Sequence, residues 1–427
     1  MSSTVAVEDL RLGMYIHLEG GWLSHPFPLS SFRITSAAEI STLRGLGLAR
    51  VCWVPEKSEL ASASPGAPQA AAPVLPSPAQ RAAEQQRQWL ALQREAALRC
   101  ERQHGEAAKA WREAADALGA QPALAGATTV SLTQAMLDKM LTSDEVGIRL
   151  VNGGGDRAAS HALNVAVISM LIGRTLGLVD GEMLDLGVGA LQHDIGKQDL
   201  PDRLRHAEDG FTGAEMNGYR DHVAKGVLQG QRMKLSAGAL MVIAQHHEHA
   251  DGSGFPLRLS ADRLSLGARI VAIVNRYDNL CNPGSGTLPL TPHEAVAMLF
   301  AQSRTRFDPP VLNAFIRMMG VYPAGSLVQL TDDRFAMVVG VNSSRPLRPR
   351  VLVHGAALAR AGLREAAAND VQCQLLDLET QHDLGIRRSL AASKVPPAVL
   401  ASLDPRPRVA YYFEPLARDA QPLELAA

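Results

Sequence analysis

Along most of the chain, apolar residues recur every three or four positions, and this spacing predicts a multidomain, mainly α protein. The first residues are an exception. Residues 5–18 alternate apolar and polar side chains, as a small strand pair would, and residues 37–46 and 49–54 predict a short helix followed by a strand. We therefore expect residues 1–57 to form a small α+β module at the N-terminus.

Residues 58–80 are mostly alanine, serine and proline, with almost no large apolar side chains, and this composition predicts a flexible linker. A long helix is expected next, in the interval 81–130. Between residues 80 and 118 its small and apolar residues form one weakly apolar stripe. The stripe consists of Trp89, Leu92, Ala96, Cys100, Ala107, Trp111, Ala114 and Leu118. It favours two interpretations equally: a homodimer through the 81–118 helix, or packing against its own chain.

Helical spacing continues through residues 131–320 with little strand-like alternation, which predicts an all-α core. After Gly320 the pattern changes to short alternating runs, which predict a small β-rich C-terminal appendage over residues 321–427. The expected strands are residues 326–330, 335–341, 350–354, 371–376 and 408–413.

Composition excludes several classes of protein. The chain has 42 Lys and Arg against 43 Asp and Glu, so its formal net charge of -1 gives no global attraction for a nucleic-acid polymer or an anionic membrane. The four cysteines are scattered and form no CxxC pair, which argues against a disulfide framework or a cysteine zinc site. The N-terminus lacks a signal peptide's apolar core, and no run approaches the roughly 20 apolar residues of a membrane span. We therefore expect a soluble, cytoplasmic protein.

The candidate chemistry centres on residues 191–197, Leu-Gln-His-Asp-Ile-Gly-Lys. His193 and Asp194 offer an imidazole nitrogen and a carboxylate side by side, which suits zinc, manganese or iron, and a carboxylate can bridge two ions. Lys197 lies about one helical turn after His193, where it would face an anionic substrate.

Further histidines join this pair. The chain has 13 histidines, and those at 161, 193, 222, 246 and 247 all fall within or at the ends of predicted helices of the all-α region. Several neutral imidazoles with one bridging carboxylate are what a two-metal site needs to activate water toward phosphorus. Residues 251–256, Asp-Gly-Ser-Gly-Phe-Pro, follow directly, and their two glycines permit the loop to fold under a ligand at the metal.

In order and spacing, these motifs resemble the HD-GYP family of metal-dependent HD phosphohydrolases. The motifs are His193-Asp194-x-Gly-Lys, His222, His246-His247, residues 251–256 and Ala268-Arg269-Ile270. The resemblance covers roughly residues 161–320 and implies an HD-type helical metal-binding core that hydrolyses cyclic di-GMP to pGpG or GMP by a metal-bound hydroxide, in bacterial second-messenger signalling. The N-terminal module, with residues 12–16 and Gly21-Trp22, resembles an uncharacterised domain often found ahead of HD-GYP domains.

The resemblance also implies individual roles. It implies two divalent metal ions, most often Fe or Mn. Their ligands would be His161, His193, Asp194, His222, His246 and His247. Asp194 would bridge the ions and Lys197 would meet the scissile phosphate, so these two are the catalytic candidates. The substrate-binding candidates are Asp251, Gly252, Gly254, Phe255 and Pro256, and supporting positions behind the ligands are assigned to Arg269, Asn275 and Asp278.

Three departures from the family pattern concern function. Phe255 replaces the family's tyrosine, which keeps the stacking surface and removes the hydroxyl. Asn275 stands where the family has a metal-binding aspartate, so one cation loses an anionic partner. The loop over residues 281–290 has no Arg or Lys, although the family's loop carries basic residues that hold the substrate.

Two classes of function therefore follow. The intact histidines, Asp194 and Lys197 favour an active phosphodiesterase. Asn275 and the Arg- and Lys-free loop favour a regulatory module that binds metal, nucleotide or a signalling partner protein without turnover. An HD hydrolase for a different nucleotide shares the same metal chemistry and is a third interpretation.

Overall fold

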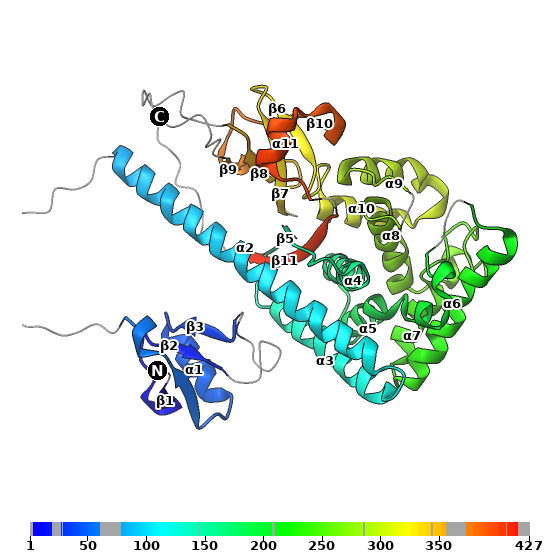
Figure 1. Cartoon of the computed structure of the whole chain (residues 1–427), viewed down its shortest axis with the longest axis horizontal. Coiled ribbons are helices and arrows are strands. Elements are labelled where there is room, and N and C mark those ends of the chain that lie inside the picture. The colour runs from blue at the N-terminus through cyan, green and yellow to red at the C-terminus, as the bar shows by residue number, and fades with distance from the viewer. Residues whose placement is uncertain are drawn as a thin grey trace, which may run out of the picture. The chain divides into compact units, whose positions relative to one another are not determined.

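The structure is a computed structural model, which describes residues 3–18, 27, 29–59, 78–143, 145–206, 210–284, 287–342, 345–355, 373–406 and 408–416. Contacts divide the chain into two compact units, Met1–Arg99 and Cys100–Ala427. Helix α2 (Pro78–Ala117) runs through the division, and each unit is described by itself (Figure 1). Most of the predicted linker, residues 60–77, lies outside the described residues, as do Gly21 and Trp22.

The N-terminal unit contains a four-stranded antiparallel sheet in the order β1-β4-β2-β3. Its elements are β1 (Ser3–Ala6), β2 (Tyr15–His17), β3 (Ser31–Arg33), α1 (Ala37–Gly45) and β4 (Arg50–Trp53). Helix α1 begins with a capping box between Ser36 and Glu39, and the unit's core includes the fully buried Ile16 and Leu43. The predicted α+β module is confirmed, with the two strands of residues 5–18 both pairing with β4 rather than with each other.

The second unit is mostly helical. Its helices are α3 (Pro122–Met140), α4 (Arg157–Thr175), α5 (Asp180–Gln192), α6 (Gly213–Arg232), α7 (Ala237–Gln245), α8 (Leu266–Cys281), α9 (Pro292–Arg306) and α10 (Pro309–Met319). Helix α4 is central: residues 162–173 are all buried, and the helix packs against α5, α8, α10 and the C-terminal strand β11 (Ala410–Leu416). The predicted helical core is confirmed. The long helix expected between residues 80 and 118 is α2, but the helix does not fill the interval 81–130, because the chain turns after Ala117 and α3 begins at Pro122.

The C-terminal part of α2 packs against its own chain. Cys100, Ala107 and Ala114 are buried, and the Trp111 indole donates a hydrogen bond of 3.0 Å to the carbonyl of Leu191. The apolar stripe between residues 100 and 118 is therefore used within the chain, as the second of the two interpretations states.

The remaining strands form a seven-stranded antiparallel sheet. They are β5 (Glu145–Val151), β6 (Leu327–Leu330), β7 (Phe335–Asn342), β8 (Arg350–Val353), β9 (Gln374–Asp377), β10 (Ile386–Leu390) and β11, with the short helix α11 (Pro397–Leu403) alongside. The expected β-rich C-terminal region is confirmed. Strand β5 was expected to be part of the all-α stretch; it pairs instead along its whole length with β11, so the helical core and the sheet belong to one compact unit.

A buried charge cluster joins three strands of this sheet. Glu414 on β11 accepts hydrogen bonds from Arg149 on β5, at 2.9 and 3.0 Å, and from Arg350 on β8 at 2.6 Å. No helix among the described residues is both long and apolar enough to cross a membrane.

Candidate metal centre

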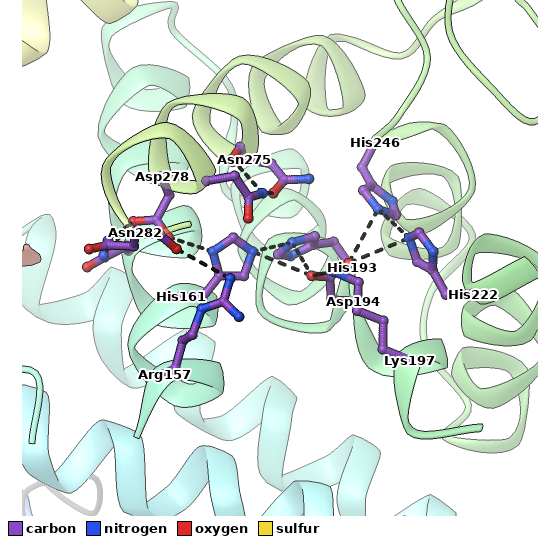
Figure 2. Close-up of polar contacts among 12 residues, drawn as sticks. Arg157, His161, His193, Asp194, Lys197, His222, His246, Asn275, Asp278 and Asn282 are labelled. Atoms are coloured by element: carbon purple, nitrogen blue, oxygen red, sulfur yellow. Dashed lines mark hydrogen bonds and ion pairs between the residues drawn. The ribbon is translucent and has the colours of Figure 1, made fainter. Parts of the chain in front are cut away.

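The first histidine of the site is placed by the beginning of α4. The Asp156 carboxylate caps this helix by accepting a hydrogen bond of 3.2 Å from the Ala159 amide. His161 follows in the second turn, and its Nδ1–H donates to the Asp278 carboxylate on α8 at 2.6 Å. Nε2 of His161 is thereby left to face the other ligands (Figure 2).

His193 and Asp194 lie at a break in the helix rather than within it. Helix α5 ends at Gln192, not at Ile195 as the sequence pattern indicates, and a 3-10 turn (Ile195–Asp199) follows. Gly196 permits a close approach to α6, because a Cβ atom there would lie 2.0 Å from the His222 carbonyl oxygen. The turn can therefore pack closely on α6, and it carries Lys197 toward Asp194.

Three histidines use the same local device to fix their tautomer. Nδ1–H of His193 donates to the Ala190 carbonyl at 2.7 Å, that of His222 to Tyr219 at 2.6 Å, and that of His246 to Ile243 at 2.8 Å. A carbonyl oxygen can only accept, so Nδ1 carries the proton in each ring. Nε2 is then a lone-pair donor, which is the form that binds a metal ion.

Asp194 lies between two groups of these lone pairs. Its Oδ2 atom is 3.5 Å from Nε2 of both His161 and His193. Its Oδ1 atom is 3.6 Å from Nε2 of His222 and 3.8 Å from Nε2 of His246. The donor atoms therefore form two sets, each close enough to share one ion, and Asp194 belongs to both. The first set is His161, His193 and Asp194, and the second is Asp194, His222, His246 and His247.

Electrostatics keep most of these rings neutral. Burial lowers the pKa of His222 to about 4 and holds the pKa values of His246 and His247 well below the ordinary range. For His161 burial acts in the same direction, but hydrogen bonds to the carboxylates of Asp194 and Asp278 outweigh it and raise the pKa to about 9.

The donor atoms of the cluster fit a metal centre. The His222 and His246 Nε2 atoms approach to 3.4 Å, although their lone pairs repel unless a cation lies between them. The His161 and His193 Nε2 atoms lie 3.1 Å apart, a distance that either a proton on His161 or a shared metal ion can bridge. Two donor atoms that share one ion at about 2.1 Å lie roughly 3 Å apart. The Asp194 Oδ1 and His247 Nε2 atoms are also buried without a hydrogen-bond partner among the described residues.

Asp278 orients His161 and is itself held by two asparagines. Its Oδ1 atom accepts hydrogen bonds from Asn164 at 2.7 Å and Asn282 at 2.9 Å, and the carboxylate is fully buried. The same two amides donate to the Val409 carbonyl at 3.0 and 2.9 Å, just before β11. A carboxylate behind a ligating imidazole fixes the ring and raises its basicity, so the C-terminal strand is connected to the candidate metal centre through this network.

Asn275 lies one turn before Asp278 on α8 and is also buried. Its Oδ1 atom accepts a hydrogen bond of 2.6 Å from Asn279. The amide therefore brings an oxygen without a negative charge to this side of the site (Figure 2).

The loop after the double histidine is fastened by Glu248, whose role the sequence pattern does not reveal. The buried Glu248 carboxylate accepts hydrogen bonds from the amides of Leu257 at 2.6 Å and Leu259 at 2.9 Å. Gly254 packs so closely that a Cβ atom would lie 2.5 Å from the His247 carbonyl oxygen. The loop is thus folded directly against the double histidine.

Phe255 is the candidate of this loop that reaches the cluster. Its ring stacks on His247 with centroids 4.4 Å apart and planes at 21°. The exposed Asp251 carboxylate accepts from the Ser253 amide at 2.9 Å, and Gly252 adopts a positive φ of 75°. Asp251 and Gly252 therefore shape the turn, with the exposed Pro256 after Phe255.

Arg269 has contacts of a different kind from those expected. It donates to the carbonyls of Leu264 and Ala261 and to the Asp308 carboxylate at 2.9 Å. In the described part of the chain these partners include none of the candidate ligands. Arg269 thus fastens the segment after the loop to the beginning of α10.

Comparison with known proteins identifies two domain families in the chain. A family model described as an HD domain matches residues 142–311, and a model described as a domain of unknown function (DUF3391) matches residues 2–128. The chain is 30% identical over 382 residues to the cyclic di-GMP phosphodiesterase PA4108 of Pseudomonas aeruginosa, which covers 84% of this chain and 87% of that protein.

Two further relatives match the helical region. One is the 3'3'-cGAMP-specific phosphodiesterase 2 of Vibrio cholerae, with 30% identity over 186 residues, covering 42% of this chain and 36% of that protein. The other is the cyclic di-GMP phosphodiesterase response regulator RpfG of Xanthomonas campestris, with 32% identity over 152 residues, covering 35% of this chain and 40% of that protein. With the HD motif at the centre of the ligand cluster, the chain belongs to the HD-GYP family of HD-domain phosphodiesterases.

Proposed function

We propose that this protein hydrolyses cyclic di-GMP to pGpG or GMP in bacterial second-messenger signalling, using two divalent ions, Fe or Mn. The observation that carries the proposal is the shared position of Asp194, which belongs to both groups of candidate ligands. One carboxylate between two sets of imidazoles is the arrangement that a two-metal phosphodiesterase requires. The relatives named for cyclic di-GMP support the choice of substrate.

When bound, the two ions would activate water and neutralise charge on the phosphate oxygens. His161 and His193 would hold one ion, and His222, His246 and His247 the other, with Asp194 between them. The hydrogen bonds at Nδ1 keep the rings oriented with Nε2 toward the centre, so little reorganisation accompanies binding.

Lys197 supplies a positive charge beside the bridging carboxylate. Its ammonium group donates to Asp194 Oδ2 at 2.6 Å and lies 5.4 Å from the centroid of the Tyr219 ring. Burial favours the neutral amine, but the Asp194 charge raises the pKa of Lys197, so the group is charged at pH 7. An ammonium has three N–H donors, and those not used by Asp194 are suited to the scissile phosphate.

Phe255 offers an aromatic surface next to the second ligand group. Arg220 is on α6, and its guanidinium lies 5.2 Å from the centroid of the Phe255 ring. A stack of imidazole, phenyl ring and guanidinium is a surface on which a nucleobase can also stack. We infer that a base of the substrate would stack here without a tyrosine hydroxyl.

A second candidate function is regulation without turnover. Asn275 favours it, because one ion would lack an anionic ligand. In that case the protein would bind metal and nucleotide and act on a signalling partner or on a second copy of itself. The homodimer through the 81–118 helix also stays a proposal, and the burial of the stripe at Cys100, Ala107 and Ala114 within the chain argues against these residues forming its interface. A cytoplasmic location is the setting we infer for either function.

The experiment is a product analysis with full-length protein loaded with Mn²⁺ or Fe²⁺. We expect cyclic di-GMP to be converted to pGpG or GMP, and Asp194→Ala to abolish the conversion. Turnover of 3'3'-cGAMP but not cyclic di-GMP would replace the proposed substrate. Absence of turnover with a metal content near two ions per chain would support the regulatory function instead.

A further inference from the structure

The loop over residues 281–290 contains no Arg or Lys, so it supplies no side-chain cation to an anionic substrate. Arg157 is the first residue of α4, one turn before His161. Residues four apart on a helix lie on the same face, so its side chain emerges beside the first metal ligand (Figure 2).

The guanidinium of Arg157 lies against the beginning of this loop. Its Nη2 atom donates to the Asn282 carbonyl at 3.3 Å. A Cβ atom built on Gly284 would lie 3.6 and 3.7 Å from Nη1 and Nη2 of Arg157. The cation therefore occupies the space that a longer side chain from the loop would otherwise fill.

The donors of Arg157 are largely unused. A guanidinium has five N–H donors, and in the described part of the chain Arg157 forms no ion pair within 4.0 Å, its hydrogen bond being the long one to Asn282. The side chain is half-buried, so it has left bulk water without gaining a carboxylate partner at contact distance. Such a group is poised for an anion.

The charged groups that act on Arg157 are of both signs. The Arg408 charge repels Arg157, while the carboxylates of Asp278 and Asp194 attract it. Burial lowers the pKa of the neighbouring His206 to about 4, so this ring is neutral at pH 7. Burial, followed by Arg408, lowers the pKa of Arg157, but an arginine stays protonated in a protein. Arg157 and Arg408 carry like charges, and a ligand with negative charge relieves their repulsion.

We propose that Arg157 binds the phosphate of the cyclic dinucleotide that is not being cleaved, in place of the basic residues missing from the 281–290 loop. The inference rests on the proposed function. A cyclic dinucleotide carries two phosphates in one ring: Lys197 and Asp194 mark the reacting one, and Arg157 lies on the other side of His161. A planar guanidinium pairs with two phosphate oxygens at once, which a lysine at the same place does not do.

The test compares Arg157→Gln and Arg157→Lys on two substrates, with full-length metal-loaded protein. One substrate is cyclic di-GMP and the other is bis(p-nitrophenyl) phosphate, a diester with no second phosphate. We expect Arg157→Gln to raise KM for cyclic di-GMP by about 10- to 100-fold, with a smaller effect on kcat, because one charge-assisted contact is lost. Arg157→Lys should recover part of this loss, and kinetics with the simple diester and the metal content should stay unchanged.

Arg112→Gln is the matched control. Arg112 also contacts the beginning of α4, through Asp156 at 3.3 Å, but it lies on α2 and its side chain is exposed. An unchanged KM in Arg157→Gln, an equal loss on both substrates, or a loss of bound metal would overturn the inference and assign Arg157 a purely structural role.

Failure of the proposed function gives a different result. If the wild-type protein binds cyclic di-GMP in calorimetry without cleaving it, catalysis is refuted, and a weaker affinity in Arg157→Gln would still support the inference. If the wild-type protein neither binds nor cleaves it, both are overturned.

Discussion

Replacing Asp278 by asparagine should weaken metal binding although Asp278 belongs to neither group of candidate ligands. The substitution keeps the volume of the side chain and removes its charge. In the structure Asp278 accepts three hydrogen bonds, from His161 at 2.6 Å, Asn164 at 2.7 Å and Asn282 at 2.9 Å. An amide can present its oxygen to only one side, so its NH₂ group would face a donor in either orientation.

The expected size follows from the role of this carboxylate. Groups that orient a ligating histidine typically contribute about 10- to 100-fold in metal affinity, which corresponds to roughly 1.4 to 2.8 kcal/mol. We expect Asp278→Asn to lose affinity in this range at the group that contains His161. Asn282→Ala removes one donor and leaves the carboxylate, so its effect should be smaller.

Competition with a chromophoric chelator measures the affinity directly, with Mn²⁺ as the ion. Asp185→Asn is the control, since it removes the charge of a carboxylate on α5 that accepts a hydrogen bond from Ser236 and belongs to neither group of candidate ligands. Thermal unfolding of the metal-free proteins separates a loss of fold from a loss of affinity. An affinity within twofold of wild type in a folded Asp278→Asn protein would refute the reasoning.

Two further predictions concern charge. Asn275→Asp should raise metal affinity by about tenfold, or about 1.4 kcal/mol, because it adds an anionic oxygen where Asn279 already donates; an unchanged affinity in the chelator assay would exclude Asn275 from the metal site. Glu414→Gln should lower the free energy of unfolding by about 3 to 5 kcal/mol, since Arg149 and Arg350 would stay buried without a carboxylate. Arg350 and Arg149 outweigh burial and lower the pKa of Glu414 to about 2, so its stabilisation is present above the ordinary glutamate pKa and is lost as the pH falls toward 2. Urea unfolding at pH 7 and pH 3 measures the effect of the substitution and its pH dependence. If lowering the pH from 7 to 3 destabilises the wild-type protein no more than Glu414→Gln, the predicted pH dependence is wrong.

The residues that the sequence analysis assigns to the metal site are those whose chemistry is visible locally. His193 and Asp194 are adjacent, His246 and His247 are adjacent, and each lies at the end of a helical pattern. The structure brings them together with His161 and His222, although their roles as ligands stay a proposal.

Contacts between distant parts of the chain were not predictable in this way. Asn164 and Val409 are 245 positions apart, and no pattern near either residue indicates that they meet behind Asp278. Arg157 gives no signal for the same reason, since its position depends on the packing of α4 against the loop after α8. Long-range pairing of this kind is set by tertiary packing rather than by local spacing.

Strand β5 was not predicted, although its sequence has the alternation that is typical of a strand. Val146, Ile148 and Leu150 alternate with polar or small residues, which is typical of a strand. The helical pattern on both sides obscured this short run. The shared sheet has a functional consequence, since β11 both completes the pairing with β5 and contacts the network behind His161.

The central claim is that Asp194 bridges two metal ions, and metal stoichiometry tests it most directly. Calorimetric titration of metal-free protein with Mn²⁺ should show two ions per chain for wild type. His247→Ala should weaken one of the two sites, whereas Asp194→Ala should weaken both, because Asp194 belongs to both groups of donor atoms. Retention of one site at wild-type affinity in Asp194→Ala would contradict the bridging role.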